Sequence, residues 1–526
     1  MTTILALNAG HDGSTVILSD GRLLASIEAE KDSLKRHSKL TAGTLVAALE
    51  LCEAVPDVIA LGGWHKHLPG YYTGIGQGYF GLFAPTTRKT SVFGHPVTVV
   101  ESTHERSHIF CAVGMDPFGP HRDCAVLVWE GALGNLYRWS NWGDRIECHP
   151  VLAYPGTKYA AFYDLADPLF SSGARPRDTN AGKLMALASF GDAESAHPED
   201  VKTVHALLTT DVIYPFDKDA FTDSPLYNIG LESIRFRNAA AYLSRAIFGM
   251  FLRCATEQFS GEDLPLVVAG GCGLNCDWNS SWVAAGLFSR VFVPPCPNDS
   301  GSAIGTAIDA QFTLGGSPRI DWDVYAGSEL IDDLATTPPG WTERAFDPAL
   351  AAARLARQEV IAYMQGRSEI GPRALGHRSL LASPAMHGMR DRLNSIKKRE
   401  VYRPVAPCVL MSEYDNYFEG GVSDPYMLYI SNVRSGAIPA VTHVDGSARV
   451  QVVTEEDGSS LSPLLQAFHG ASGVPVLCNT SLNWPGRGFI NKATEALAYC
   501  QEREIESLVV GTRWFVSDNL HLGNAG

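Results

Sequence analysis

The chain has 526 residues, 45% of them hydrophobic and 19% charged, a balance that excludes a largely disordered protein. At roughly 150 residues per domain, this length predicts two to four domains. Lys and Arg total 42 and Asp and Glu total 57, so the formal charge is −15, and we expect no nucleic acid as the main partner of so acidic a chain.

The amino end, residues 1–10, has neither the basic segment nor the apolar core of a signal peptide. No window of the chain approaches about 18 uninterrupted apolar residues, so we expect no membrane span. The 11 cysteines are scattered and form no C-x-x-C pair, which is typical of free thiols in a reducing compartment. These observations predict a cytoplasmic protein without disulfides.

The first half of the chain contains two segments of the same design, each a strand, a glycine-containing turn and a second strand. In the first, residues 3–7 and 15–18 are apolar and flank the small, polar segment 8–14. In the second, residues 124–130 and 136–139 flank a similar turn. This repetition predicts a duplicated α/β core.

The boundary between two predicted domains falls in residues 314–347. This stretch is rich in Pro, Gly and Asp and has no helical or strand periodicity. It follows a small-residue helix at 301–312, and a helix followed by a strand is expected in 348–363. We therefore place one domain at 1–340 and the other at 341–526.

The first polar segment reads Asn-Ala-Gly-His-Asp-Gly-Ser and holds two residues with acid–base chemistry. Asp12 could orient a nucleophile or a metal ion, and His11 could accept a proton. The backbone N–H groups of such a turn can also hold a phosphate. An ordinary hairpin with polar turn residues explains the segment equally well.

Residues 104–108 read His-Glu-Arg-Ser-His. On a helix, this spacing places His104 and His108 on one face, as half of a metal site. The string also satisfies the H-E-x-x-H pattern of zinc metalloproteases, which needs a third ligand downstream and an open cleft. Two histidines on a helix surface are the simplest alternative.

Three further segments contain residues that suit a nucleotide or a metal ion. Gly270 and Gly271 follow a buried strand and permit a ligand to approach the backbone, with Asn275 just beyond them. Asp299 stands at the amino end of a small-residue helix, where it suits a helix cap or a metal ligand. Lys183 follows a glycine at a predicted helix start and could neutralise a phosphate, although a lone Gly-Lys pair is common.

Cationic residues are concentrated in the second predicted domain. Residues 366–379 hold three arginines among three glycines, and Lys397 and Arg403 follow them. Such side chains provide the charge and the donors that phosphate and carboxylate oxygens require. The apolar strand 474–477 runs into Asn-Thr-Ser, whose amide and hydroxyl groups could bind an oxyanion. Together these segments predict an anion site.

These segments, in this order, give the chain a resemblance to a known family over nearly its whole length. It resembles the O-carbamoyltransferases of the NodU and antibiotic-tailoring family. The resemblance is carried by AGHDGS at 9–14, HERSH at 104–108, GGCGLNC at 270–276, NDSGSAIG at 298–305, GRSEIGPRALGHRS at 366–379, KKREVYRPVAP at 397–407 and VPVLCNTSLN at 474–483.

The resemblance implies an N-terminal duplicated domain of the actin/sugar-kinase/Hsp70-like (Kae1-like) type and a C-terminal α+β YrdC-like domain. The second domain would make carbamoyl-adenylate from carbamoyl phosphate and ATP with Mg²⁺, releasing pyrophosphate and phosphate. The first would pass the carbamoyl group to a hydroxyl of a small molecule, an antibiotic or other natural product of the cephem, nucleoside or aminosugar type. Fe²⁺ is the metal that the family leads us to expect, and a homodimer is compatible with it.

Carried over position by position, the resemblance gives each candidate residue a role. The implied metal ligands are His104, His108, Asp299 and Glu130. The implied catalytic residues are His11 and Asp12, beside the acceptor hydroxyl, and Arg373 and Lys397, beside carbamoyl phosphate. The implied nucleotide-binding and triphosphate-binding residues are Lys183, Gly270, Gly271, Asn275, Arg403, Arg449, Ser481 and Asn483.

Three positions depart from the family pattern. Glu130 stands where the family usually has Asp, Lys31 lies in Glu-Lys-Asp where Glu-Arg-Phe is more usual, and Leu482 replaces a Phe. The first departure bears on the geometry or the identity of the metal, and the other two suggest a divergent acceptor. Three other functions stay open: a tRNA-modifying enzyme, since Kae1 and YrdC proteins elsewhere act on tRNA; a sugar-kinase-like phosphotransferase, which would yield ADP; and a non-catalytic sensor.

Overall fold

The computed structural model describes residues 2–52, 55–65, 75–92, 94–211, 213–454 and 459–518. The chain forms two compact units. The first unit contains residues 1–107 and 299–526, and the second unit contains residues 108–298. The predicted boundary at 340/341 lies inside the first unit and stays a prediction.

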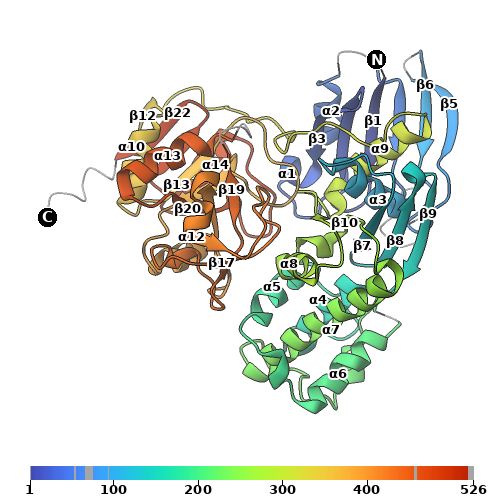
Figure 1. The fold of residues 1–526 in the computed structure, drawn as a ribbon. Helices are drawn as coiled ribbons and strands as arrows, with labels where there is room; N and C mark the ends of the chain where they lie inside the picture. Colours follow the sequence, from blue (N-terminus) through green and yellow to red (C-terminus); the bar gives the residue numbers. More distant parts are fainter. Residues whose placement is uncertain are drawn as a thin grey trace. The chain divides into compact units, whose positions relative to one another are not determined.

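A six-stranded sheet forms the amino-terminal part of the first unit, in the order β3-β2-β1-β4-β6-β5 (Figure 1). Its strands are β1 Thr3–Asn8, β2 Ser14–Ser19, β3 Arg22–Glu28, β4 Val58–Leu61, β5 Thr86–Val92 and β6 His95–Glu101. Strands β1, β2 and β3 are antiparallel, whereas β1, β4 and β6 are parallel. Helix α2 (Ala42–Leu49) packs on β2 and β3, and helix α9 (Ser302–Thr313) packs on β1, β2 and β4. The short helix α1 (Ala29–Ser33) follows β3 directly.

The second unit repeats this design in a five-stranded sheet with the order β11-β10-β7-β8-β9. Its strands are β7 Cys124–Trp129, β8 Gly134–Ser140, β9 Arg145–Pro150, β10 Leu266–Ala269 and β11 Val291–Phe292. Again three strands are antiparallel (β7, β8, β9) and three are parallel (β7, β10, β11). The shared pattern confirms the predicted duplicated α/β core.

The helices of the second unit connect β9 to β10 and β10 to β11. They are α4 Pro155–Ala166, α5 Thr179–Ala188, α6 Pro198–Thr209, α7 Ile234–Phe259 and α8 Cys276–Ala285. Helix α3 (His104–Met115) begins in the first unit and ends in the second. Among the described residues, no helix has both the length and the apolar character that crossing a membrane would need. All 11 cysteines are free thiols, as expected.

The carboxyl-terminal part of the first unit, residues 341–518, contains a mixed eight-stranded sheet in the order β12-β22-β21-β13-β14-β20-β15-β19. Its strands are β12 Trp341–Ala345, β13 Ile361–Met364, β14 Arg378–Ala382, β15 Ala406–Leu410, β19 Gln451–Val453, β20 Val476–Ser481, β21 Ser507–Val510 and β22 Arg513–Ser517. A small sheet contains β16 Phe418–Glu419, β17 Ser431–Val433 and β18 Ser447–Ala448. The helices are α10 Pro348–Ala356, α11 Gly388–Ile396, α12 Tyr414–Tyr417, α13 Leu461–Ser472 and α14 Ala493–Glu502. The helix and strand predicted in 348–363 correspond to α10 and the start of β13.

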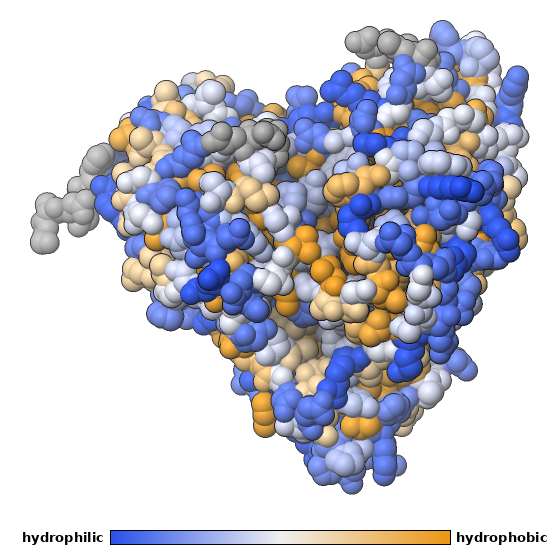
Figure 2. Space-filling model, viewed as in Figure 1, coloured by the Kyte–Doolittle hydropathy of each residue, from blue (hydrophilic) through white to orange (hydrophobic). Residues whose placement is uncertain are grey.

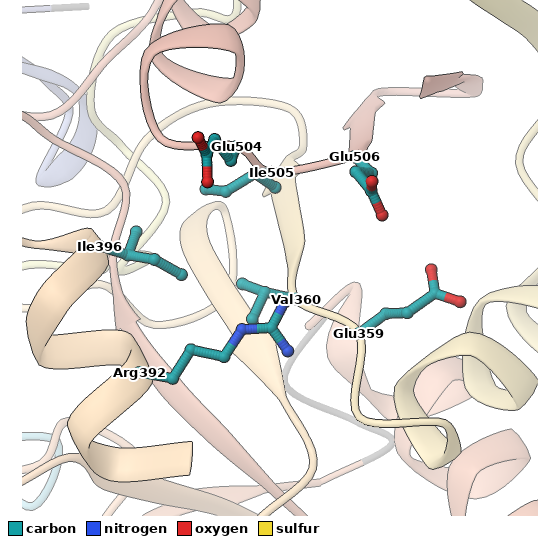
Figure 3. Close-up of a pocket in the computed structure, with 7 residues that line it drawn as sticks. All are labelled: Glu359, Val360, Arg392, Ile396, Glu504, Ile505 and Glu506. Atoms are coloured by element: carbon teal, nitrogen blue, oxygen red, sulfur yellow. The ribbon is translucent and has the colours of Figure 1, made fainter. Parts of the chain in front are cut away.

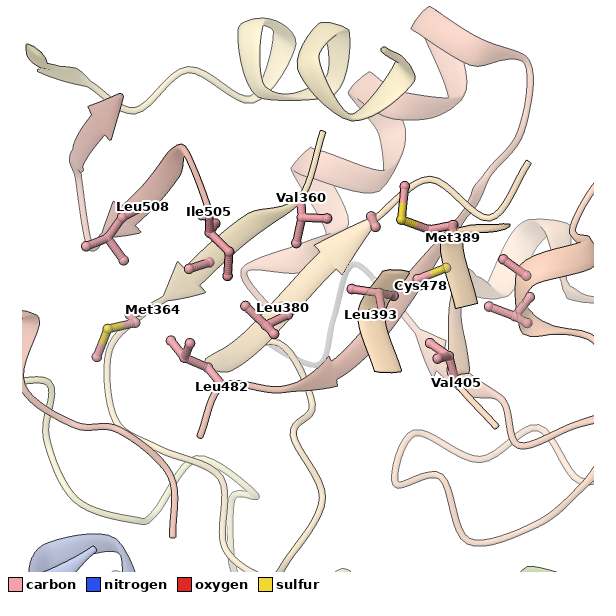
Figure 4. Close-up of a cluster of buried hydrophobic side chains, with 14 of the residues drawn as sticks. Val360, Met364, Leu380, Met389, Leu393, Val405, Cys478, Leu482, Ile505 and Leu508 are labelled. Atoms are coloured by element: carbon pink, nitrogen blue, oxygen red, sulfur yellow. The ribbon is translucent and has the colours of Figure 1, made fainter. Parts of the chain in front are cut away.

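Both faces of this sheet are buried, because alternate residues of each strand point to opposite sides. Ile361 and Leu381 pack with residues of α10 and α13. Met364 and Leu380 pack on the other face with α11 residues such as Leu393 (Figure 4). A sheet covered on both faces gives the loops at its edges a rigid base. The likeness of this part to YrdC stays a prediction.

Truncation in this core should be costly. Leu380 is fully buried on the central strand β14, so Leu380→Ala should lower the free energy of unfolding by about 2–5 kcal/mol. Leu350→Ala is the matched control, since Leu350 on α10 is 48% exposed and its loss should change stability by less than about 0.5 kcal/mol. Urea unfolding followed by circular dichroism measures both, and equal effects of the two substitutions would contradict the described packing.

Candidate functional site

The turn between β1 and β2 holds a carboxylate between two imidazoles. Asp12 is buried and has a φ of 51°. Its Oδ2 lies 2.9 Å from His11 Nδ1, and its Oδ1 lies 3.1 Å from His37 Nδ1. Burial would raise the pKa of Asp12, but the hydrogen bonds with His11 and His37 hold that pKa far below its usual value. Burial would lower the pKa of His37, whereas Asp12 raises it above its usual value. Asp12 is therefore a carboxylate that orients two potential proton acceptors.

His37 was not predicted from the sequence. It lies 25 residues after Asp12 in a Lys-Arg-His-Ser-Lys string whose composition resembles a solvated basic loop. Its backbone N–H donates to Glu30 Oε2 at 3.2 Å, and its φ is 53°. Only tertiary folding brings the ring to Asp12, so no local spacing could have identified it.

Asp299, which was predicted as a metal ligand, lies beside this cluster. Its carboxylate lies 3.4 Å from His11 Nδ1 and 3.5 Å from His104 Nε2, and all of these side chains belong to the first unit. The Asn8 side-chain amide donates to the Asp299 carbonyl oxygen at 3.1 Å. The structure therefore brings together four of the predicted residues, namely His11, Asp12, His104 and Asp299.

A buried ion pair fixes the start of helix α3 against helix α9. Arg106 donates to both carboxylate oxygens of Asp309, at 2.9 and 2.6 Å, and Ser102 donates to the same carboxylate at 2.5 Å. Ser107 and Thr306 share a further hydrogen bond of 2.8 Å. Because His104 begins α3 and residue 299 lies just before α9, these contacts determine how that imidazole and that carboxylate meet.

Glu105 has a structural function. Its carboxylate accepts the backbone N–H of Gly81 at 2.6 Å, and its own N–H donates to the carbonyl oxygen of Tyr79 at 3.0 Å. In a zinc metalloprotease this glutamate would serve as the general base. Here it holds residues 79–81 against the helix, which disfavours the metalloprotease interpretation.

In the second unit, His108 pairs with Glu130. His108 Nε2 lies 3.8 Å from Glu130 Oε2, both side chains are buried, and Glu130 Oε1 accepts the Leu133 N–H at 3.2 Å. His108 stands one turn after His104 on the continuous helix α3, so the two rings project from the same side of that helix. Each of the four predicted metal ligands, His104, His108, Glu130 and Asp299, offers one atom that can bind a metal ion, either an imidazole nitrogen or a carboxylate oxygen.

The predicted nucleotide residues of the second unit occupy two places. Gly270, with a φ of 91°, follows β10, and a Cβ there would lie 2.3 Å from the Trp129 carbonyl oxygen, so only glycine fits. At Gly271 a Cβ would meet no atom within 4 Å. Asn275 caps helix α8 by accepting the N–H groups of residues 277 and 278. Lys183, on α5, lies 5.7 Å from the centre of the Tyr163 ring.

Two of the three arginines in residues 366–379 are bound to the protein itself. Arg367 donates to the carbonyl oxygens of Leu24, Ala326 and Gly327. Arg378 is fully buried and donates to Asn491 and to carbonyl oxygens of its own loop, and burial lowers its pKa to about 10. The third, Arg373, is half-buried.

The loop that contains Arg373 is fixed from two strands. The Asn479 side chain donates to the Ala374 carbonyl oxygen at 3.1 Å, and that of Gln451 donates to the Leu375 carbonyl oxygen at 2.7 Å. Arg449 comes two residues before Gln451, and Ser481 two residues after Asn479. These contacts place the Arg373 loop beside strand β20, which ends at Ser481, and strand β19, which begins two residues after Arg449.

Lys397 is buried in a shell of oxygens. Its ammonium donates to the carbonyl oxygens of Ser481 and Asn483, at 2.5 and 2.9 Å, and to both side chains. Burial, and then the charges of Arg399 and Arg503, lower its pKa well below the usual value. In this structure Lys397 fixes the turn at 481–483, and its catalytic role stays a prediction.

Three guanidinium groups lie close enough to repel one another. Burial, and then the charges of Arg403 and Arg449, lower the pKa of Arg399 to about 9. Arg399 donates to Asn394 Oδ1 and to the Pro404 carbonyl oxygen. Among the described residues, the buried Nε of Arg449 has no hydrogen-bond partner. Concentrated positive charge of this kind is suited to an anion.

A separate pocket lies elsewhere in the carboxyl-terminal part. Figure 3 shows Arg392 reaching from helix α11 towards Val360, and its guanidinium donates to the Gln358 carbonyl oxygen at 2.6 Å. The other lining residues are Glu359, Ile396, Glu504, Ile505 and Glu506. No predicted site residue lines this pocket, so it is not the candidate site.

The ion pair between Arg106 and Asp309 should be essential for the first unit. Asp309→Ala leaves a buried guanidinium without its carboxylate and should lower the free energy of unfolding by about 3–5 kcal/mol. Glu147→Ala breaks the exposed pair with Arg145 and should change it by less than about 1 kcal/mol. Urea unfolding of both variants tests this difference, and a mild effect of Asp309→Ala would argue against the pair as the support of the site.

Comparison with known proteins adds independent information. Residues 83–308 match the family described as "Carbamoyltransferase N-terminus", and residues 352–517 match "Carbamoyltransferase C-terminus". The chain is 46% identical over 514 residues to the 3'-hydroxymethylcephem-O-carbamoyltransferase of Amycolatopsis lactamdurans, covering 97% of this chain and 99% of the relative. It is 31% identical over 596 residues to Nodulation protein U of Rhizobium tropici, covering 99% of both.

A solved structure with a partial likeness is the activator of the 2-hydroxyisocaproyl-CoA dehydratase from Clostridium difficile. It is 12% identical, has a TM-score of 0.33, and covers 58% of this chain and 93% of that one.

The sequence matches extend over nearly the whole chain and contain the motifs described above. The chain is therefore a member of the carbamoyltransferase family, and it is an enzyme.

Proposed function

We propose that the chain is an ATP-dependent O-carbamoyltransferase that modifies a hydroxymethyl group of a cephem. One observation carries this proposal: the relatives that match the chain end to end at 46% identity have names that state this reaction. The site agrees chemically, because imidazoles oriented by a carboxylate and a cluster of cations are the two elements that such a transfer needs.

In the proposed first step, which the carboxyl-terminal part would carry out, one water molecule cleaves carbamoyl phosphate to carbamate and phosphate. A carbamate oxygen then forms a bond to the α-phosphorus of ATP, and the bond from that phosphorus to pyrophosphate breaks, so that carbamoyl-adenylate forms. Arg373, Arg403 and Arg449 would bind the phosphate groups of the two substrates. The mutual repulsion of the guanidinium groups around Arg399 supports this role, since a bound anion would relieve it. Lys397 would hold Ser481 and Asn483 in position for the same anion.

In the proposed second step, the acceptor hydroxyl oxygen forms a bond to the carbamoyl carbon. The bond from that carbon to the phosphate oxygen of AMP breaks, and AMP leaves with the electron pair. His11 or His37 would take the hydroxyl proton, and Asp12 would stabilise the imidazolium that results. Lys183, Gly270, Gly271 and Asn275 would line the nucleotide.

We also propose that His104, His108, Glu130 and Asp299 together hold one divalent cation. Two imidazoles and two carboxylates suit iron, zinc or manganese, and the family resemblance favours Fe²⁺. Glu130, with one more methylene than Asp, reaches His108 and can complete such a site. When bound, the cation would supply positive charge beside the reacting oxygens.

Three further proposals concern the conditions of the reaction. Mg²⁺ would accompany ATP, and the enzyme would work in the cytoplasm. A homodimer is compatible with these proposals.

Two other functions make different predictions. A sugar-kinase-like phosphotransferase would produce ADP, whereas the proposed enzyme produces AMP and pyrophosphate. A tRNA-modifying enzyme would retard tRNA at physiological salt, which the charge of −15 disfavours. Mass spectrometry on a panel of hydroxylated cephems, nucleosides and aminosugars with ATP and carbamoyl phosphate tests the proposal directly. We expect a carbamoyl group on the cephem hydroxymethyl, seen as a net mass gain of CHNO, and unmodified alcohols would contradict the proposal.

Loss of an imidazole at the proposed metal site should separate the two steps. His104→Ala should lose bound iron and transfer to the alcohol but still release pyrophosphate, because the proposed first step uses the cations of the carboxyl-terminal part and not this imidazole. Metal analysis after loading with Fe²⁺ and a pyrophosphate assay measure both effects. His197→Ala, at an exposed histidine of the second unit, is the control. Full metal content in His104→Ala would refute the ligand assignment.

Loss of Arg373 should impair the first step and spare the transfer to the alcohol. Arg373→Ala should weaken use of carbamoyl phosphate by about 10- to 100-fold, as for a lost charged hydrogen bond, and should spare transfer from supplied carbamoyl-adenylate. Arg357→Ala, at an exposed arginine of the same part, is the control. Equal loss of both activities in Arg373→Ala would count against two separate steps.

A further inference from the structure

A group of aromatic rings lies beside His11 in the first unit. The Trp64 ring centroid is 5.0 Å from those of His11 and His104 and 5.3 Å from that of Tyr79. Trp64 is almost fully buried. A Cβ at Gly10 would lie 2.4 Å from its ring, so the turn that holds the catalytic pair requires glycine to accept this tryptophan. The indole therefore connects the reacting imidazole to the other rings.

The ring group extends from this buried centre to the surface. His65 stacks on Tyr79 at 3.9 Å with an interplanar angle of 10°, and Phe80 lies 4.9 Å from Tyr79 and 5.9 Å from His65. Tyr79 is buried, whereas Phe80 is 49% exposed. On the face drawn in Figure 2, hydrophobic side chains reach the surface in separate patches among hydrophilic ones. Packing explains Trp64 and Tyr79, but it does not explain a half-exposed phenyl ring beside them.

The exposed end of this group is held rigidly. Gly81, next to Phe80, is bound through its N–H to Glu105 and through its carbonyl oxygen to Thr103, each at 2.6 Å. The Tyr79 carbonyl oxygen accepts the Glu105 N–H. Because Glu105 and Thr103 flank His104, the position of Phe80 is tied to the candidate metal ligand. A ring that is both exposed and fixed at a reaction centre is suited to bind a substrate, because little conformational entropy is lost on binding.

We propose that Phe80 and His65 form the wall on which the acceptor lies, and that this wall selects an acceptor with an unsaturated ring beside its hydroxymethyl group. This inference rests on the proposed O-carbamoyl transfer and specifies its acceptor site. Aromatic rings favour contact with an unsaturated, weakly hydrated ring. Phe80 and His65 offer no carboxylate to a polycationic aminosugar, and the carboxylate of Glu105, next to the wall, is engaged with Gly81. A cephem, whose hydroxymethyl group is attached to an unsaturated ring, has the required chemistry.

The test measures kinetics of the full chain with ATP, carbamoyl phosphate and a hydroxymethylcephem, with an aminoglycoside alcohol as the second acceptor. Phe80→Ala should raise KM for the cephem about tenfold or more, with kcat changed less than about threefold, since the lost contact is with the ring and not with the reacting oxygen. Pyrophosphate release should equal that of the wild type. Phe80→Tyr should restore KM, and Phe118→Ala, at a 65% exposed ring in the second unit, should leave it unchanged.

The outcomes separate this inference from the proposed function. If the wild type carbamoylates the cephem and Phe80→Ala has the same KM, the wall is refuted and the function stands. If the wild type prefers the aminoglycoside, the proposed selectivity is refuted. If the wild type modifies no alcohol, the proposed function fails, and calorimetric binding of the cephem to the wild type and Phe80→Ala then tests the wall alone: about tenfold weaker binding to Phe80→Ala supports it, and equal binding overturns it.

Discussion

The candidate site depends on one buried ion pair, that between Arg106 and Asp309. It joins the first turn of helix α3 to helix α9, and each of these helices begins at or just after a residue of the site. A buried guanidinium held at two points by a carboxylate has a fixed direction as well as a fixed position. His104 begins one of the two helices that this pair joins, and Asp299 lies just before the other, so the pair supports the contact between their side chains.

A second buried cation, Lys31, connects helix α1 to the loop that contains Arg373. Lys31, on helix α1, donates to Glu28 at 2.8 Å and to the carbonyl oxygens of Glu369 and Gly371 at 2.5 and 2.9 Å. Burial raises the pKa of Glu28, and the charge of Lys31 opposes that rise. The helix leads to His37 in one direction along the chain, and its lysine contacts the loop of Arg373. This contact gives the unusual lysine at this position a physical role.

Much of the fold was predictable because its signals are local. Two strand–turn–strand patterns predicted the duplicated core. The four-residue spacing of His104 and His108 predicted that the two imidazoles lie on one face of a helix. His37 and the rings around Trp64 were not predictable, because they reach the site only through tertiary contacts. Sequence also could not tell how each cation is satisfied. Lys397, Arg367 and Arg378 donate to protein oxygens, whereas Arg399 also lies within reach of the charges of Arg403, Arg449 and Glu400. A cation at a glycine-rich turn has the same sequence signature in both situations.

The central claim is that one chain activates a carbamoyl group with ATP and then delivers it to an alcohol. The most direct measurement supplies carbamoyl phosphate labelled at its carbon, together with ATP and a hydroxymethylcephem, and quantifies labelled ester and nucleotide products in the same reaction. The account predicts that the label enters the cephem and that one AMP forms for each ester. Formation of ADP with a phosphorylated acceptor, or of ester without any AMP, would contradict it.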